Sequence, residues 1–270
     1  MSREDIDVAD AVRELFEEDG IEVILSAETQ AVTGRSGTGV TLQVETQAGT
    51  RTVSGTHLLV AAGRTPNTRG IGLEEAGIAL TDRGYVRVDA RLRTTAEGVW
   101  ALGECAGSAQ FTHVAFDDFR VVRDDLARTR EDDHQAEDGA PGDAARNPRT
   151  TTDRLVPYCA FIDPQLARVG LDERSAEREG TPVRVARTDM SKVLRARAIG
   201  ETRGFMKMLV ARDSDEILGF TMLGADAGEV VAVVQMAMLG GLPYTAVRDA
   251  ILTHPTMAEG LGVLLASEPV

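Results

Sequence analysis

The sequence predicts an α/β first half followed by a separate α+β domain. Two continuous apolar runs that end in glycine, residues 58–63 and 98–103, are typical of central strands in a parallel sheet. After residue 154, strand patterns in pairs are followed by helical patterns, which is typical of an α+β domain. The stretch 128–154 between these parts is charged and almost free of large apolar residues. A chain of 270 residues is long enough for two modest domains.

The first half begins with a helical pattern. Apolar residues recur at near-helical spacing over 4–19 and the pattern stops at Gly20, so we expect a helix there. Strands are expected at 21–25, 39–45 and 50–53.

A glycine cluster at 34–39 lies between strand patterns. Its glycines are in the wrong order for a dinucleotide fingerprint and they do not open a helix, so we interpret it as a hairpin loop. A further helical pattern runs from Val114 to Leu126. The stretch 128–154 buries too little apolar surface to offset its ordering entropy, so we predict a flexible linker.

The second half carries strand patterns joined by a polar turn. Aspartates and a serine at 213–216 are typical of a hairpin turn. The expected strands are 155–161, 203–211 and 217–223, and the expected helices are 172–179, 226–240, 245–252 and 257–266.

Composition limits the classes of partner. The formal net charge of -14 argues against nucleic acid, because phosphate binding needs a concentrated basic face. No apolar run is long enough for a membrane span, and the polar, acidic first residues do not resemble a signal peptide, so we expect a cytoplasmic protein. Cys105 and Cys159 are too few and too far apart for a disulfide framework or a metal cluster, so no metal site is expected.

His254 and Glu259 form the most informative pair of residues. An imidazole beside a carboxylate transfers protons near neutral pH. The alternative is a capping box, in which Thr256 and Glu259 open a helix behind Pro255. The residues alone favour the capping box, although both interpretations require the same geometry. A hydrolase using His254 is disfavoured, since no serine or cysteine lies in a nucleophile-elbow motif.

Two further positions follow the apolar runs. Glu104 ends the run 98–103, where a carboxylate can accept hydrogen bonds from ligand hydroxyls, although a polar residue at a strand end is common. His113 and Val114 open the next helix, whose free N–H groups offer an acceptor site, with a capping or packing role as the alternative for His113. Gly63 ends the other run and permits a close backbone approach.

Taken together and in this order, four segments resemble motifs of the FAD-dependent pyridine nucleotide–disulfide oxidoreductases. This family includes dihydrolipoamide dehydrogenase, glutathione reductase and mercuric reductase. The segments are 62–67, 99–104, 158–170 and 254–259. The resemblance covers the chain except for the linker, and the order of the motifs makes it specific.

The resemblance implies a fold class and domain boundaries. The fold is a truncated FAD/NAD(P)-binding Rossmann-like region followed by an α+β dimerisation domain. Residues 1–62 correspond to the C-terminal half of an NAD(P)-binding domain and 63–127 to the returning segment of an FAD-binding domain. The flexible acidic linker or insert is 128–154, and the dimerisation domain is 155–270.

The resemblance also implies roles for residues. His254 is the acid–base group that protonates a thiolate leaving group of the other protomer, and Glu259 orients it. The cofactors are FAD and NAD(P)H, and a homodimer forms through 155–270. The residues expected at FAD are Gly63, Arg64, Gly103, Glu104, Val114 and Ala115.

Several details resemble one branch, the mercuric-reductase-like flavoproteins that include the reactive-chlorine-resistance, cupric-reductase type. They lie at 110–113, 117–118, 195–197, 241–244 and 254–261. Residues 266–270 contain no cysteine pair, so mercuric ion is not expected as a substrate. A disulfide, cupric ion or another oxidant stays open, as does NAD versus NADP.

The departures from the family lead to two hypotheses. The 270 residues contain no GxGxxG loop and no CxxxxC redox pair, and Glu104 stands where the family usually has aspartate. The first hypothesis is an oxidoreductase whose N-terminal half is supplied elsewhere. The second is a non-catalytic dimerisation or interaction remnant. Under the first hypothesis, we expect the purified chain alone not to retain flavin, because the pyrophosphate loop is missing.

Overall fold

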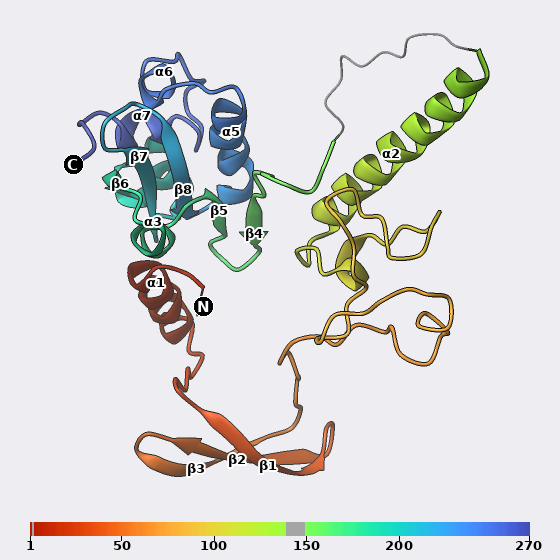
Figure 1. Ribbon diagram of the computed structural model, residues 1–270. Coiled ribbons are helices and arrows are strands. Elements are labelled where there is room, and N and C mark those ends of the chain that lie inside the picture. The colour runs from red at the N-terminus through yellow and green to blue at the C-terminus, as the bar shows by residue number, and fades with distance from the viewer. Residues whose placement is uncertain (2, 139–148) are drawn as a thin grey trace. The chain divides into compact units, whose positions relative to one another are not determined.

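The computed structural model describes residue 1 and residues 3–138 and 149–270. The chain divides into two compact units (Figure 1). Unit 1 consists of Met1–Gly63 and Cys159–Val270, and unit 2 consists of Arg64–Tyr158. In the described residues, no helix is long and apolar enough to cross a membrane.

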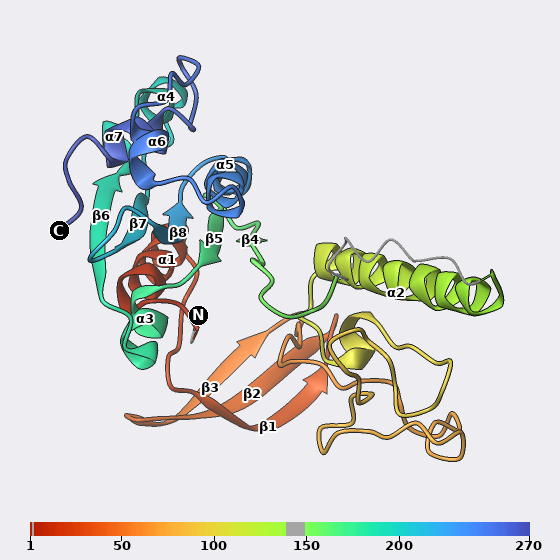
Figure 2. The same ribbon diagram turned by 45° about the horizontal axis from the view of Figure 1, so that its top comes forward.

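Unit 1 contains a five-stranded sheet in the order β4-β5-β8-β7-β6 (Figure 2). Neighbouring strands from β5 to β6 run antiparallel. Residues 205–210 of β7 are all buried, so both faces of the sheet are covered. The strands are β4 (Tyr158–Ala160), β5 (Leu166–Gly170), β6 (Val183–Asp189), β7 (Phe205–Ala211) and β8 (Ile217–Leu223).

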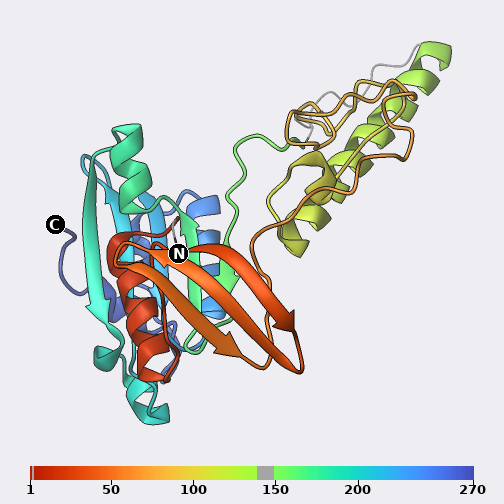
Figure 3. The same cartoon turned by 90° about the horizontal axis from the view of Figure 1, so that it is seen from below.

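Helices cover the two faces of this sheet. Figure 3 shows α1 (Ile6–Glu18) lying along one face, where Val8, Val12 and Leu15 pack against Leu166, Phe205 and Leu223. The opposite face carries Met206, because side chains alternate along a strand. Gly260 of α7 (Gly260–Leu264) lies against it, since a Cβ there would be 2.8 Å from Cε of Met206. The remaining helices of this part are α3 (Glu173–Glu179), α4 (Leu194–Ile199), α5 (Ala227–Leu239) and α6 (Tyr244–Arg248), with the 3-10 turn η2 at Met190–Lys192.

A second, three-stranded antiparallel sheet has the order β1-β2-β3. Its strands are β1 (Glu28–Arg35), β2 (Gly39–Thr46) and β3 (Gly49–Gly55). Gly34 has a positive φ of 93°, and a side chain there would collide with the carbonyl oxygen of Gly39. The prediction of a hairpin loop at 34–39 is therefore confirmed.

Unit 2 has little regular structure apart from one long helix. Its elements are the 3-10 turn η1 (Gly103–Ala106) and α2 (Thr112–Asp138). Isolated bridges join Leu80 to Val86 and Arg93 to Trp100. Ion pairs to the buried carboxylates of Asp118 and Asp125 connect other segments of this unit to α2.

Most helices and strands expected after residue 154 are present, and the turn at 213–216 joins β7 to β8. The helix expected at 4–19 is α1. Its end at Gly20 is confirmed, because Gly20 has φ 82° and Ile21 N–H donates to the carbonyl of Phe16 at 2.8 Å. The elements that sequence reasoning missed are β1, β5, β6 and α4.

Three predicted strands are wrong. Residues 21–25, 58–63 and 98–103 form no strand. Their apolar side chains are largely exposed, with Leu59 89% and Val60 73% exposed. A strand needs a neighbouring backbone for its N–H and C=O groups, and none of the described residues forms a ladder with these runs.

The flexible linker expected at 128–154 is wrong over 128–138, because α2 continues through these residues. Its arginine, glutamate and alanine residues are good helix formers, and extending an existing helix is far easier than nucleating one. The part at 139–148 lies outside the described residues.

Candidate functional site

The His254–Glu259 pair is formed in unit 1. Nδ1 of His254 lies 3.0 Å from both carboxylate oxygens of Glu259. An ionised carboxylate only accepts hydrogen bonds, so Nδ1 carries the donated proton. A neutral imidazole held in this way keeps the lone pair on Nε2, which is then the atom that can exchange a proton.

The loop before α7 fixes this pair. The hydroxyl of Thr256 accepts the N–H of Glu259 at 3.2 Å and donates to the carbonyl of Thr253 at 2.7 Å. Met257 and Leu261 on either side of Glu259 are buried and anchor the loop. The Thr256 half of the capping box is therefore present, while the Glu259 carboxylate is directed to the imidazole. Both sequence interpretations describe part of the geometry.

The imidazole is accessible from outside unit 1. The side chain of His254 is 62% exposed and that of Glu259 is 31% exposed. The imidazole is thus more exposed than the carboxylate that holds its Nδ1.

Glu104 in unit 2 forms an ion pair with Arg64. The distance from Arg64 Nη1 to Glu104 Oε2 is 2.7 Å, and the side chains are 61% and 45% exposed. Gly103 before it is buried and has φ 72°, a left-handed conformation suited to glycine. Two of the predicted FAD-contact residues, Arg64 and Glu104, are thus brought together on the surface. Gly63 also has a positive φ, 110°.

The start of α2 offers fewer free donors than expected. The N–H groups of Val114 and Ala115 both donate to the carbonyl of Phe111 at 3.1 Å. Among the described residues, the N–H groups without a partner at this helix end are those of Thr112 and His113. Any backbone contact with a ligand here therefore falls to them.

His113 itself is a packing residue. Its Nε2 lies 2.8 Å from the carbonyl oxygen of Pro157, to which it donates. Its ring stacks on Phe111 with centroids 5.2 Å apart, and Phe111 stacks on Tyr158 at 5.9 Å. These contacts match the packing alternative stated for His113.

The two cysteines are both free thiols. Cys105 is exposed, whereas Cys159 is partly buried. Burial, together with the charge of Glu229, raises the pKa of the Cys159 thiol, which lowers its thiolate fraction at neutral pH.

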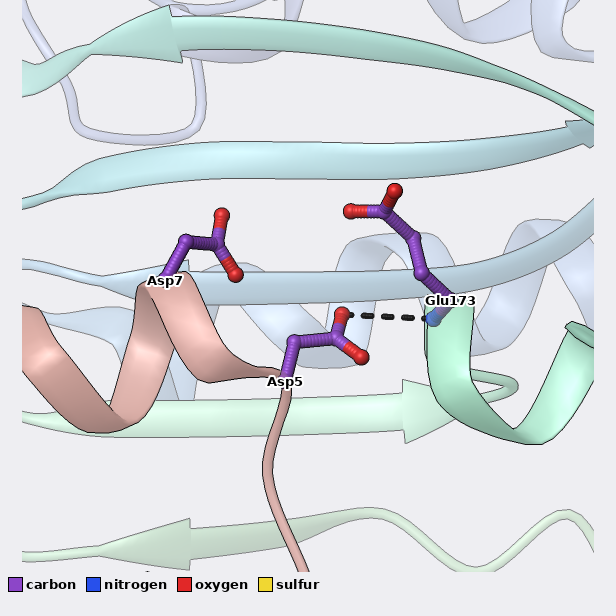
Figure 4. A group of neighbouring side chains, drawn as sticks. All are labelled: Asp5, Asp7 and Glu173. Atoms are coloured by element: carbon purple, nitrogen blue, oxygen red, sulfur yellow. Dashed lines mark hydrogen bonds between the residues drawn. The ribbon is translucent and has the colours of Figure 1, made fainter.

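An acidic cluster in unit 1 is held by a lysine. One carboxylate oxygen each of Asp5, Asp7 and Glu173 lie within 4.8 Å of one another (Figure 4). Nζ of Lys207, a fully buried side chain, lies 2.7 Å from Asp5, 2.9 Å from Asp7 and 2.7 Å from Glu173. Burial opposes the charge of Lys207, but the hydrogen bonds to Asp5, Glu173 and Asp7 outweigh it and raise the lysine pKa. The ammonium occupies the position that a cation would need, so the cluster is structural.

This lysine connects the beginning of the chain to the five-stranded sheet. Asp5 also accepts the N–H groups of Glu173 and Arg174 at the start of α3, at 3.2 and 3.0 Å. Sequence reasoning did not find this cluster, because Asp5 lies 168 positions before Glu173 and 202 positions before Lys207.

Comparison with known proteins identifies the class. The profile described as "Pyridine nucleotide-disulphide oxidoreductase" matches residues 1–118, and that of the dimerisation domain of the same family matches 156–264. The chain therefore belongs to the pyridine nucleotide–disulfide oxidoreductase family, with a Rossmann-like oxidoreductase region and a dimerisation domain.

Within the family, the chain is similar to RclA of Escherichia coli, described as a probable pyridine nucleotide-disulfide oxidoreductase. The two are 35% identical over 98% of this chain and 56% of the relative. A Cu(II) complex of the HOCl-induced flavoprotein disulfide reductase RclA from Escherichia coli matches with a TM-score of 0.84 and 36% identity, over 98% of this chain and 56% of that chain. Dihydrolipoyl dehydrogenase of Geobacillus stearothermophilus is 28% identical over 93% of this chain and 50% of the relative. The chain thus spans about half the length of these relatives.

Proposed function

We propose that this chain is the acid–base and dimerisation portion of an RclA-like, FAD- and NAD(P)H-dependent oxidoreductase. The observation that carries the proposal is the His254–Glu259 pair, in which a partly buried carboxylate holds Nδ1 at 3.0 Å and the imidazole side chain is 62% exposed. A remnant without chemistry has no need for both residues in this arrangement.

The proton chemistry follows from the hydrogen bond. Nε2 of protonated His254 gives its proton to a departing thiolate, which leaves as a thiol, and later recovers a proton from a thiol. Glu259 stabilises the charged imidazole between these steps. FAD, when bound, supplies the electron transfer between NAD(P)H and the disulfide.

The residues proposed at the flavin are Gly63, Arg64, Gly103, Glu104, Val114 and Ala115. The carboxylate of Glu104 is accessible to ligand hydroxyls, and the unpaired N–H groups of Thr112 and His113 suit an acceptor group. The N–H groups of Val114 and Ala115 are occupied and the Val114 side chain is buried, so these two residues are proposed to support the helix start behind the free donors. This set fits one edge of a flavin, and the glycine loop for the pyrophosphate is not among these residues.

A homodimer through 155–270 is part of the proposal. On α5, Val233, Met236 and Leu239 are 37%, 65% and 61% exposed and are spaced along one side of the helix. An exposed apolar stripe of this kind suits a partner surface. Met236→Glu is expected to shift the chain toward monomer in light scattering, and a wild-type chain that is already monomeric would contradict a dimer.

The substrate and the remaining partner are also proposals. The Cu(II) complex of RclA makes cupric ion a candidate beside disulfides. The FAD loop and the redox cysteine pair are proposed to come from a separate N-terminal half. Location in the cytoplasm and the domain boundaries given above stay predictions.

A non-catalytic remnant is the second candidate. Glu104 in place of aspartate and its ion pair with Arg64 favour it, because the pair engages the carboxylate that would face the flavin. Adding a family N-terminal half that carries GxGxxG and CxxxxC separates the two. NAD(P)H oxidation that depends on both pieces supports the oxidoreductase, and its absence with both pieces folded supports the remnant.

A further inference from the structure

A buried carboxylate on α2 holds the turn that carries Glu104. The side chain of Asp118 is fully buried. Its Oδ2 accepts the N–H of Gly103 at 2.7 Å, and its Oδ1 accepts Nη1 of Arg154 at 2.6 Å. Hydrogen bonds to ionised groups are the stronger class, so both oxygens hold their segments firmly.

The backbone conformation of Gly103 determines the orientation of the Glu104 side chain. Gly103 is buried, has φ 72° and begins η1, so its backbone conformation decides where the Glu104 side chain leaves the turn. The turn closes on itself, because Gly107 N–H donates to the carbonyl of Glu104 at 2.9 Å. The N–H of Gly103 is thus the point at which α2 holds the turn through a side chain.

Arg154 balances the buried charge. Its side chain is 14% exposed, and its Nε also lies 3.2 Å from Asp117. A buried carboxylate without a cation would carry a large desolvation penalty. Arg154 comes 36 residues after Asp118 in sequence, so the pair joins a segment beyond the end of α2 to the first part of that helix.

We propose that Asp118, charge-balanced by Arg154, is a positioning residue that holds Glu104 in the orientation needed for flavin contact. This inference rests on the proposed function. Asp118 does not touch the ligand itself, and it acts through the Gly103 N–H.

Asp125 supplies a matched control on the same helix. It lies about two turns further along and is 2% exposed. It accepts Nε and Nη2 of Arg93 at 2.6 and 2.7 Å and Nε1 of Trp100 at 2.9 Å. Removing its carboxylate breaks an ion pair with an equally buried carboxylate, whose arginine is more exposed (43% against 14%), but breaks no hydrogen bond to the η1 turn.

The test compares Asp118→Ala with Asp125→Ala in the full chain. Hydrogen exchange of the Gly103 amide is measured first, without any cofactor. FAD dissociation is then measured by flavin fluorescence after complementation with the N-terminal half. Asp118→Ala removes one charged hydrogen bond. We therefore expect the exchange rate of the Gly103 amide and the dissociation constant of FAD each to rise by roughly tenfold or more. Asp125→Ala is expected to change both values by less than about twofold, although it destabilises unit 2 comparably.

The outcomes are distinct. Equal loss of FAD affinity in the two variants, or unchanged Gly103 exchange in Asp118→Ala, would overturn the positioning role. Absence of FAD binding by the complemented wild type would refute the proposed function, and the positioning role with it. If Asp118→Ala does not fold, Asp118→Asn is compared with Asp125→Asn, since Asn keeps the shape but faces one donor with its own amide. Arg154→Lys retains the charge and should keep Gly103 exchange near wild type.

Discussion

Similar apolar sequences adopt different structures in the five-stranded sheet of unit 1 and in the loops of unit 2. Residues 205–210 are buried on both faces and lie between two ladder partners. Residues 98–103 are equally apolar in pattern, yet Val99 and Leu102 are 37% and 39% exposed and the run holds only one bridge. An apolar run therefore forms a strand only where the chain also supplies neighbouring strands that pair with its backbone.

The two candidate sites differ in the same way. The His254–Glu259 pair in unit 1 is complete with residues of one loop. The Glu104 turn in unit 2 presents a few groups and depends on α2 for its orientation. Under the proposed function, unit 1 therefore carries the complete acid–base pair, and unit 2 carries only part of the flavin-binding site.

Substitution of His254 is expected to have the largest effect. His254→Gln should lower NAD(P)H-dependent disulfide reduction by the complemented protein by about 10²-fold or more, the usual contribution of a general acid–base group. Flavin content should be unchanged, because unit 2 is untouched. Activity near wild type would contradict the acid–base role proposed for His254. Glu259→Gln should cost less, since the imidazole remains.

A stability change confined to unit 1 comes next. Lys207→Met leaves the carboxylates of Asp5, Asp7 and Glu173 without their cation and should destabilise unit 1 by about 3 kcal/mol. Chemical denaturation followed by hydrogen exchange measures it. Lys192→Met, at an exposed position, is the control and should stay within about 0.5 kcal/mol. Equal effects of the two variants would show that the cluster does not hold α1 to the sheet.

The pH dependence tests the buried carboxylates of both units. Burial alone would raise the pKa of Asp172, but hydrogen bonds from Ser175 and the charge of Arg168 outweigh burial and lower it. The pKa of Asp125 is lowered in the same way, since Arg93 and Trp100 outweigh its burial. A lowered folded-state pKa contributes stability that is present above the unfolded value, about 3.9, and is lost as pH falls through the folded value.

The thermal stability of both units, measured as the unfolding temperature, is therefore expected to decrease as pH falls below about 4. Asp172→Asn should make the loss of stability with falling pH less steep in unit 1 only, and Asp125→Asn should do so in unit 2 only. Asp213→Asn, in the exposed turn, is the control and should leave the pH dependence unchanged. The same slope in all three variants would rule out these carboxylates as the cause.

The smallest expected effect concerns the surface pair in unit 2. Arg64→Gln removes an ion pair between half-exposed groups, so it should change the free energy of unfolding by less than about 1 kcal/mol. Its effect on FAD affinity in the complemented protein decides whether Arg64 assists Glu104 or competes for it. Tighter binding in the variant would favour the remnant hypothesis.

Sequence reasoning succeeded where local chemistry decides the structure. The end of α1 at Gly20, the hairpin at 34–39 and the geometry of His254 with Glu259 all depend on neighbouring residues. It failed for 98–103, because ladder partners cannot be read from a single run.

It also missed the Lys207 cluster and the link from Asp118 to Gly103. In both cases an ordinary charged residue is paired with groups that the fold brings from distant positions. A lysine in an otherwise apolar strand pattern, as at 205–211, is the signal that could have indicated the Lys207 cluster.

One measurement tests the division of labour between the units most directly. The chain, alone and mixed with an N-terminal half carrying GxGxxG and CxxxxC, is passed through gel filtration with FAD and its flavin absorbance is recorded. We expect no retained flavin for the chain alone and equimolar flavin for the mixture, with NAD(P)H oxidation that depends on His254. Equimolar flavin on the chain alone, or none in a folded mixture, would contradict it.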